Sequence, residues 1–99
     1  MFGLSETTMH KLQTLFGTYS AIDEAIIYGS RSRGDYQKGS DIDLTFTGSN
    51  LSQDMLLRLS NDIDDLLLPY NVDISILQDI NNPTLKHNIH TEGKILYKR

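Results

Sequence analysis

The sequence predicts a small α/β chain, of the α+β kind, in which helices cover a small mixed sheet. Two observations predict this class. Short segments with alternating polar and apolar residues, typical of strands, are interleaved with longer amphipathic segments of helical spacing. Capping residues precede the helical segments, and proline or glycine follows the second and the third of them. The expected order is helix, strand, strand, helix, strand, helix, and the pattern leaves strand order and direction open.

The first part of the chain predicts a helix, a strand and a loop. Ser5 can cap a helix that runs to about residue 19 and places these apolar residues on one side: Met9, Leu12, Leu15, Phe16 and Tyr19. Residues 25–28 form a short apolar run that predicts a buried strand. The loop over 29–40 is polar, holds three glycines, two arginines and a lysine, and has room for one helical turn.

The middle of the chain predicts a strand, a helix and another strand. Residues 41–47 alternate, which predicts a strand with one buried face made of Ile42, Leu44 and Phe46. A second helix is expected over 52–68, capped by Ser52 and stopped by Pro69. Its buried stripe is expected to be apolar residues at helical spacing: Met55, Leu56, Leu59, Ile63, Leu66 and Leu67. Residues 72–76 repeat the strand pattern.

The C-terminal part predicts a last helix and leaves its final segment open. Asn82 can cap this helix, Pro83 suits its first position, and Gly93 can end it. Residues 95–97 form either an edge strand or a tail docked on the core. No repeat, low-complexity tract or linker divides the chain, so residues 1–99 are interpreted as a single domain.

Composition narrows the classes of function. Thirteen acidic against nine basic residues give a net charge of −4, which repels a phosphate backbone, so we expect no nucleic-acid partner. The absence of cysteine excludes disulfides, thiolate metal sites and cysteine nucleophiles. No leader pattern or membrane-spanning apolar run is found, so we expect a cytoplasmic protein without a membrane partner. A core this small is marginal alone, which favours a partner protein or a homo-oligomer.

Three aspartates lie in or at the ends of the predicted strands: Asp41, Asp43 and Asp73. Residues two apart on a strand share a face, so Asp41 and Asp43 can converge on one ion, and Asp73 joins them if its strand is a neighbour. Clustered carboxylates repel one another unless a cation is present, and oxygen ligands prefer Mg²⁺ or Mn²⁺. The alternative is that each aspartate is a solvated strand or turn residue. The glycine-rich, cationic loop before the pair favours a metal site, because its N–H groups and arginines suit a triphosphate.

The segment from Gly29-Ser30 to Asp41-Ile42-Asp43 resembles the signature of the polymerase-beta-type nucleotidyltransferase superfamily, a Gly-Ser pair followed by Asp-x-Asp. Asp73, within Val72-Asp73-Ile74, resembles the third carboxylate of that superfamily, and residues 89–97 resemble the end of its minimal, stand-alone members. The resemblance covers nearly the whole chain. It implies the polymerase-beta-like nucleotidyltransferase fold.

The resemblance also implies an activity and its residues. The enzyme would transfer a nucleoside monophosphate, with AMP as the candidate, from a triphosphate such as ATP to a protein or small-molecule acceptor and release pyrophosphate. Asp41, Asp43 and Asp73 would be catalytic and would hold Mg²⁺ or Mn²⁺, with Asp73 on the acceptor side. Contacts to the triphosphate are implied for Gly29 and Ser30. We also expect them for Arg31, which directly follows Ser30 in the loop and carries a fork of donors, and for Ser40.

Other polar residues have competing interpretations. Arg31, Arg33 and Lys38 are each either phosphate ligands or solvated loop cations that balance nearby aspartates, and Arg33 can also pair with Asp35. His87 and His90 have the spacing of metal ligands on the last helix but lack a third ligand nearby in the sequence. Solvated surface, rather than a site, is the preferred interpretation for Tyr36, for His87 and His90, and for Asp62, Asp64 and Asp65.

A single domain of this length leaves little room for a separate acceptor-binding module, so we expect the acceptor site to be shallow or supplied by a partner. Minimal members of the superfamily are paired with a small all-helical partner of the HEPN or substrate-binding kind, some of them in toxin–antitoxin systems, and the resemblance implies such a partner here. The main alternative to an enzyme is an antitoxin or binding module that neutralises the helical partner by contact. A plain structural domain is the third possibility. The three carboxylates and the Gly-Ser pair favour an enzyme, since a pure binder has no need for a repulsive cluster.

Overall fold

The chain alternates helices and strands, and the computed structural model describes all of residues 1–99. The helices are α1 (Glu6–Gly17), α2 (Ser30–Arg33), α3 (Gln53–Asp65) and α4 (Pro83–Glu92), with a 3-10 turn η1 (Leu77–Asp79). The strands are β1 (Glu24–Tyr28), β2 (Ile42–Thr47), β3 (Val72–Ile76) and β4 (Lys94–Lys98). The predicted order is confirmed, the predicted helical turn in the loop is α2, and the open C-terminal segment is a strand.

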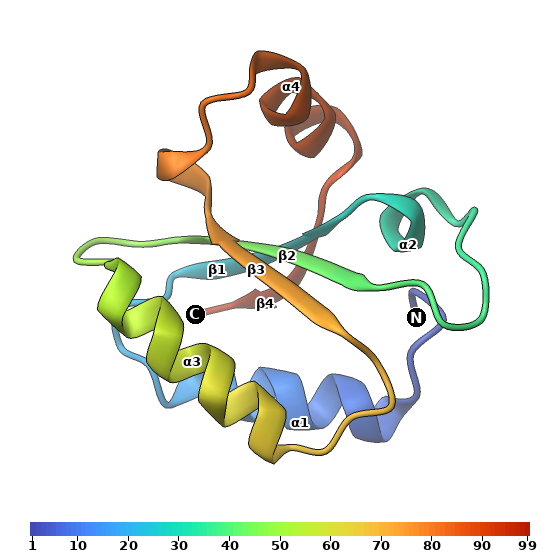
Figure 1. Ribbon diagram of the computed structural model, residues 1–99, viewed down its shortest axis with the longest axis horizontal. Helices are drawn as coiled ribbons and strands as arrows, with labels where there is room; N and C mark the ends of the chain where they lie inside the picture. Colours follow the sequence, from blue (N-terminus) through green and yellow to red (C-terminus); the bar gives the residue numbers. More distant parts are fainter.

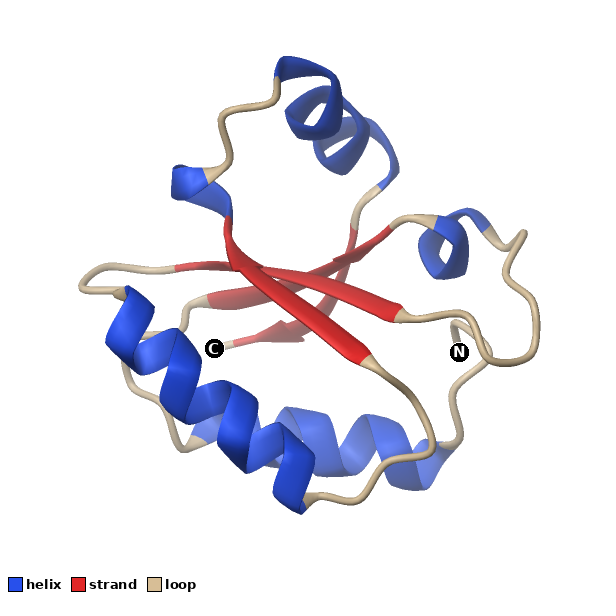
Figure 2. Ribbon diagram, in the orientation of Figure 1, coloured by secondary structure: helices blue, strands red, loops and turns tan.

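The four strands form one mixed sheet in the order β3-β2-β1-β4. β1 pairs antiparallel with both β2 and β4, whereas β2 and β3 are parallel. Helices α1 and α3 lie against one face, and α4 and η1 stand on the opposite side (Figures 1 and 2). One face of the sheet is therefore covered by two helices, and α4 covers only part of the other, which we call the open face.

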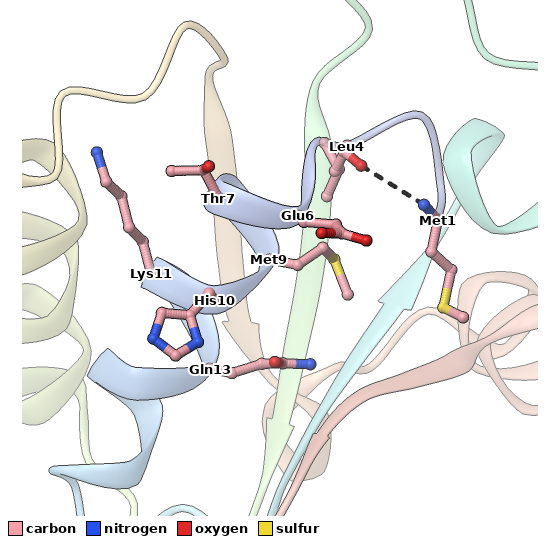
Figure 3. Close-up of a pocket in the computed structure, with 8 residues that line it drawn as sticks. All are labelled: Met1, Leu4, Glu6, Thr7, Met9, His10, Lys11 and Gln13. Atoms are coloured by element: carbon pink, nitrogen blue, oxygen red, sulfur yellow. Dashed lines mark hydrogen bonds between the residues drawn. The ribbon is translucent and has the colours of Figure 1, made fainter.

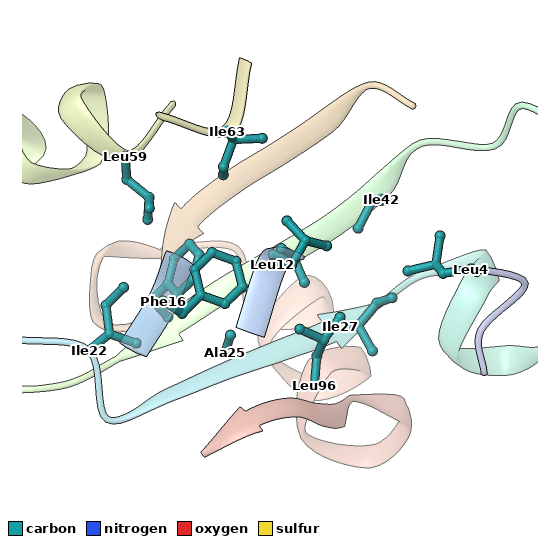
Figure 4. Close-up of a cluster of buried hydrophobic side chains, with 12 residues drawn as sticks. Leu4, Leu12, Phe16, Ile22, Ala25, Ile27, Ile42, Leu59, Ile63 and Leu96 are labelled. Atoms are coloured by element: carbon teal, nitrogen blue, oxygen red, sulfur yellow. The ribbon is translucent and has the colours of Figure 1, made fainter. Parts of the chain in front are cut away.

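The hydrophobic core lies between the sheet and the helices α1 and α3 (Figure 4). Ile42, Leu44 and Phe46 of β2 are fully buried there, as their alternation predicted. Phe16 of α1 packs edge-on against Phe46, with the ring centroids 5.1 Å apart. Burial of each such side chain contributes about 1.5–3 kcal/mol to folding. The core thus fixes which side of β2 faces the helices and which side is free.

Side-chain caps begin three helices where the sequence predicted them. Ser5, Ser52 and Asn82 accept hydrogen bonds from backbone N–H groups in the first turns of α1, α3 and α4, at 3.0–3.1 Å. Each such cap contributes about 1 kcal/mol. These contacts are local in sequence, so the residue types alone could predict them.

The second helix ends earlier than predicted. α3 stops at Asp65 instead of Leu68, and Leu67 is 86% exposed instead of buried. Leu67 has a φ of 55°, a left-handed conformation that ends the helical path before Pro69. Likewise, α1 stops at Gly17, before Tyr19.

Asp62 of α3 is not the solvated residue that was predicted. It is half-buried, and its carboxylate accepts a hydrogen bond from the hydroxyl of Tyr19. Burial, followed by the hydrogen bond to Asp62 and its charge, raises the pKa of Tyr19 to about 12. Asp64 and Asp65 are exposed, as predicted. Tyr19 and Asp62 therefore form a polar contact between the segment after α1 and helix α3.

None of the helices is both long enough and apolar enough to span a membrane.

Candidate active site

Two of the three aspartates stand side by side on the open face of the sheet. Asp43 of β2 is directly opposite Asp73 of β3, and on its other side it pairs with Tyr28 of β1. Neighbouring strands are about 4.8 Å apart, and paired residues point to the same face. Ile42 and Leu44 point into the core. Because side chains alternate along a strand, Asp43 between them faces away from the core. The sequence could only suppose that the strands of Asp43 and Asp73 are neighbours, and the sheet pairing confirms it.

The carboxylates of Asp41 and Asp73 repel that of Asp43 electrostatically. Asp43 is half-buried, and burial is the main cause that raises its pKa above the ordinary value. The negative charge of Asp73 raises it further, and that of Asp41, just before β2, adds a smaller effect. Both ion pairs of the structure belong to Arg33, so none of the three carboxylates has a cationic partner in the protein. The cluster therefore carries uncompensated negative charge.

Gly29 closes one side of this cluster. It has a φ of 76° and a ψ of −153°, a conformation that is essentially restricted to glycine. A Cβ atom at this position would lie 2.7 Å from Oδ2 of Asp43. The backbone conformation therefore requires glycine, and a side chain here would displace the Asp43 carboxylate. Ser30, the next residue, begins α2, so the Gly-Ser pair and Asp43 are immediate neighbours in space.

The side chain of Arg31, which was expected at the phosphates, is buried and makes its hydrogen bonds within the protein. Its side chain is only 3% exposed. Its Nε and Nη2 atoms donate to the backbone carbonyl of Ser40 at 3.0 and 2.8 Å, and Nη1 donates to the carbonyl of Phe2 at 3.0 Å. The hydroxyl of Ser40 accepts a hydrogen bond from the backbone N–H of Gln37 at 2.8 Å. The donors of Arg31 are thus turned into the protein rather than toward the open face.

The remaining charged residues of the loop are exposed. Arg33 pairs with Asp35 at 3.2 Å, as proposed from the sequence, and also with Glu92 of α4 at 3.3 Å, which the sequence did not suggest. Lys38 is exposed and forms no ion pair. Tyr36 is 38% exposed and lies beside Arg31, whose guanidinium carbon is 5.2 Å from its ring centre.

Two polar residues near the aspartates, Tyr28 and Ser75, were not predicted from the sequence as part of the site. Tyr28 was assigned to a buried apolar run, but its register puts it beside Asp43. The pKa of Tyr28 is raised, mainly by burial; the nearby Ser75 hydroxyl lowers it in part, and the charges of Asp43 and Asp73 raise it further. The Ser75 hydroxyl also donates to the Thr45 hydroxyl at 3.0 Å. The alternation within β1 and the position directly before the Gly-Ser pair were signals that could have identified Tyr28.

The donor set of the cluster fits a hard divalent cation, because it consists of carboxylate oxygens without a competing protein cation. The side chains are not drawn together tightly, however: no group of three or more histidine, aspartate or glutamate residues forms a ready-made metal site. His87 and His90 are exposed on α4, in agreement with the surface interpretation. The sheet assembles the carboxylates on one face, and binding would have to bring their oxygens closer.

The largest hollow of the surface is not at the aspartates. It measures about 930 Å³ and is formed by the N-terminus and the start of α1 (Figure 3), with the lining residues Met1, Leu4, Glu6, Thr7, Met9, His10, Lys11 and Gln13. A second cavity of about 400 Å³ lies between α4 and the open face, and its lining includes Ile26, Lys86 and His90. Ile26 is two residues before Tyr28 on β1, so this second cavity adjoins the aspartate row.

Comparisons with known proteins agree with this geometry. A toxin–antitoxin complex with AMP-PNP has a TM-score of 0.74 at 22% identity, over 92% of this chain and 73% of that chain. A complex of a tri-AMPylated HEPN toxin with its MNT antitoxin from Shewanella oneidensis has a TM-score of 0.70 at 19% identity, over 97% and 74%. A variant of the MntA-HpeT toxin–antitoxin has a TM-score of 0.69 at 25% identity, over 97% and 74%. At these identities the likeness establishes the fold.

A search of curated proteins gives no significant match. The family model described as "Polymerase beta, Nucleotidyltransferase" matches residues 10–99, which include the Gly-Ser pair and all three aspartates. The chain therefore belongs to the polymerase beta nucleotidyltransferase family.

Proposed function

We propose that this chain is a divalent-metal-dependent nucleotidyltransferase that moves AMP from ATP to a hydroxyl group of a HEPN-type partner protein, as one half of a toxin–antitoxin pair. The observation that carries the proposal is the row of Asp43 and Asp73 on the open face, with Asp41 just before it and Gly29 against it. A cytoplasmic location is part of the proposal. Family membership supports nucleotidyl transfer, while base, metal and acceptor are our inferences.

In this proposal, each residue of the site has a distinct role. Asp41 and Asp43 would hold Mg²⁺ or Mn²⁺ on the triphosphate side. Asp73 would hold the metal ion on the acceptor side. The chemistry that a bound divalent cation supplies is neutralisation of phosphate charge and activation of the attacking oxygen. Gly29 lets the backbone of the Gly-Ser pair approach the Asp43 carboxylate closely, since it has no side chain. Ser30 and Ser40 supply hydrogen-bond donors to phosphate oxygens.

The reaction is an in-line displacement at phosphorus. The oxygen of the acceptor hydroxyl forms a bond to the α-phosphorus of ATP, and the bond from that phosphorus to the bridging oxygen breaks. Pyrophosphate leaves with the electrons of the broken bond. The hydroxyl proton passes to the carboxylate of Asp73 and then to water. No covalent intermediate between the nucleotide and this chain is needed.

The partner is inferred from the structural neighbours. Several of them are toxin–antitoxin complexes, and one contains an AMPylated HEPN toxin. A partner that brings its own hydroxyl group would supply an acceptor to the exposed aspartates. The net charge of −4 and the exposed carboxylates disfavour a nucleic-acid acceptor. A partner protein is also consistent with exposed apolar residues such as Leu57 and Ile95, at 66% and 48% exposure.

Labelled ATP tests the proposal directly. The wild-type chain and Mg²⁺ are incubated with a HEPN-type candidate partner and with ATP labelled at the α- or at the γ-phosphorus. We expect the α-label on the partner and the γ-label in released pyrophosphate. Asp43→Asn should abolish labelling, whereas the control Asp64→Asn, an exposed aspartate on α3, should not.

The same experiment decides against the alternative function. If neither label reaches the partner, although the two proteins form a tight complex and the toxin is neutralised, the chain acts by contact and the enzyme proposal is wrong. Transfer of the γ-label would instead indicate a phosphotransferase.

A further inference from the structure

We infer that Arg31 is a positioning residue that sets the spacing of the two aspartate-bearing strands, and not a ligand of the triphosphate. This inference rests on the proposed function, because its purpose is the alignment of the metal-binding carboxylates. It starts from an unusual feature: Arg31 is buried to 97%, yet it has no carboxylate partner. A buried cation is costly unless other groups replace the water that it loses.

The groups that replace water around Arg31 come from three separate segments. Ser40 accepts two of its hydrogen bonds, and Phe2 near the N-terminus accepts the third. The guanidinium carbon also lies 4.8 Å from the ring centre of Tyr70 and 5.2 Å from that of Tyr36. A flat guanidinium can stack on aromatic rings and donate in its plane at the same time, which a lysine ammonium cannot do.

Two of these contacts stand directly before the strands of the active site. Ser40 precedes Asp41, and Tyr70 is three residues before Asp73. The two segments also touch each other, because the backbone N–H of Ile42 donates to the carbonyl of Asn71 at 2.9 Å. One guanidinium therefore contacts the entry of both β2 and β3. It is placed to fix how Asp41 and Asp43 lie relative to Asp73.

The N-terminal segment supports the same arrangement. A Cβ atom on Gly3 would come within 2.3 Å of the Tyr36 ring, so the backbone of this segment lies directly on the tyrosine beside Arg31. Leu4 is buried in the core and holds the segment in place. The clamp around Arg31 thus joins the N-terminus, the loop after α2 and the turn before β3.

Arg31→Lys tests this role, with Arg33→Lys as the matched control. Both changes keep the charge on the same short helix, but Arg33 is exposed and has only surface ion pairs. Binding of Mn²⁺ without nucleotide is measured by electron paramagnetic resonance. We expect its dissociation constant to rise about tenfold or more in Arg31→Lys, as when an outer contact of a metal ligand is lost, and to stay unchanged in Arg33→Lys.

A second readout does not depend on metal. Hydrogen exchange of the Ile42 amide, followed by NMR, should accelerate in Arg31→Lys relative to amides of α1, because the junction of β2 and β3 loosens. Tyr70→Leu removes the stacking ring and leaves Arg31 in place. This variant should raise the Mn²⁺ dissociation constant by about two- to fivefold. If Arg31→Lys does not fold, Tyr70→Leu tests the positioning role in its place.

Different outcomes would refute the positioning role of Arg31 and the proposed metal-dependent function. Arg31→Lys with wild-type Mn²⁺ binding and unchanged Ile42 exchange would refute the positioning role. Loss of metal-free tripolyphosphate binding in that variant, with Mn²⁺ binding and exchange unchanged, would make Arg31 a phosphate ligand instead. If the wild-type protein itself binds no Mn²⁺, the proposed function is wrong. Hydrogen exchange of the Ile42 amide then still tests whether Arg31 holds the two strands together.

Discussion

The two faces of the sheet are built by the same strands but serve different purposes. On the covered face, Ile42, Leu44 and Phe46 are fully buried under α1 and α3. On the open face, the alternate positions of β2 put the half-buried Asp43 beside Asp73 of β3. Because side chains alternate along a strand, one six-residue strand supplies both the core and the site. Substitution of the core-facing residues of β2 is therefore expected to harm stability, and substitution of Asp43 to harm chemistry, whereas Thr45 shares the side of Asp43 but is fully buried.

The largest expected effect is on the covered face. Phe46→Ala removes a fully buried ring that packs on Phe16, and should lower the free energy of unfolding by about 3–5 kcal/mol. Thr47→Ala changes the next residue of the same strand, on the other face, and should cost about 1 kcal/mol or less. Urea unfolding of both variants measures the difference. Equal losses would show that the two faces are not energetically distinct.

An intermediate effect is expected where the open face meets the Gly-Ser pair. Gly29→Ala should cost about 1–3 kcal/mol from backbone strain alone. It should also displace the Asp43 carboxylate and weaken Mn²⁺ binding, because the new Cβ would lie 2.7 Å from Oδ2. Gly34→Ala is the control: it has a φ of 87° but nothing within 4 Å of a Cβ atom. It should lose stability and keep its metal affinity, and equal metal affinity in both variants would contradict the role of Gly29.

The smallest effect concerns the polar contact on the covered side. The pKa of Tyr19 is raised to about 12, so the folded protein holds the phenolic proton more tightly than the unfolded chain, whose pKa is about 10. Its contribution to stability is therefore complete below pH 10 and lost as the pH rises toward 12. Tyr19→Phe should be slightly less stable than wild type near pH 7, and the gap should narrow above pH 10. A gap that stays constant in unfolding measurements from pH 7 to 11 would refute this assignment.

Much of the fold could be predicted because its signals are local. Alternation in residues 41–47 and 72–76 predicted β2 and β3, and capping residues predicted the helix starts. The early end of α3 was missed because Leu67 takes a left-handed conformation that its residue type does not favour. Strand order could not be predicted either, since the pairing of β2 with β3 joins segments far apart in the sequence.

The candidate site was predictable in its residue types and less so in its contacts. Asp41, Asp43 and Asp73 were chosen from spacing and resemblance, and the sheet does place Asp43 beside Asp73. Arg31 was expected at the phosphates because it follows Ser30 in sequence. In the structure it donates hydrogen bonds to Phe2 and Ser40, which become its neighbours only after the chain has folded. Neighbours in sequence therefore did not reveal where a long side chain finds its hydrogen bonds.

The central claim, that the open face carries the chemistry, is tested most directly by Asp73→Asn. The change is nearly isosteric and removes one charge from a repulsive cluster, so stability should hold or rise slightly. Transfer of α-labelled nucleotide to the helical partner should be abolished, while Mg²⁺-dependent binding of ATP, measured by calorimetry, should largely remain. Asp64→Asn should transfer at the wild-type rate. Undiminished transfer by Asp73→Asn would contradict the account.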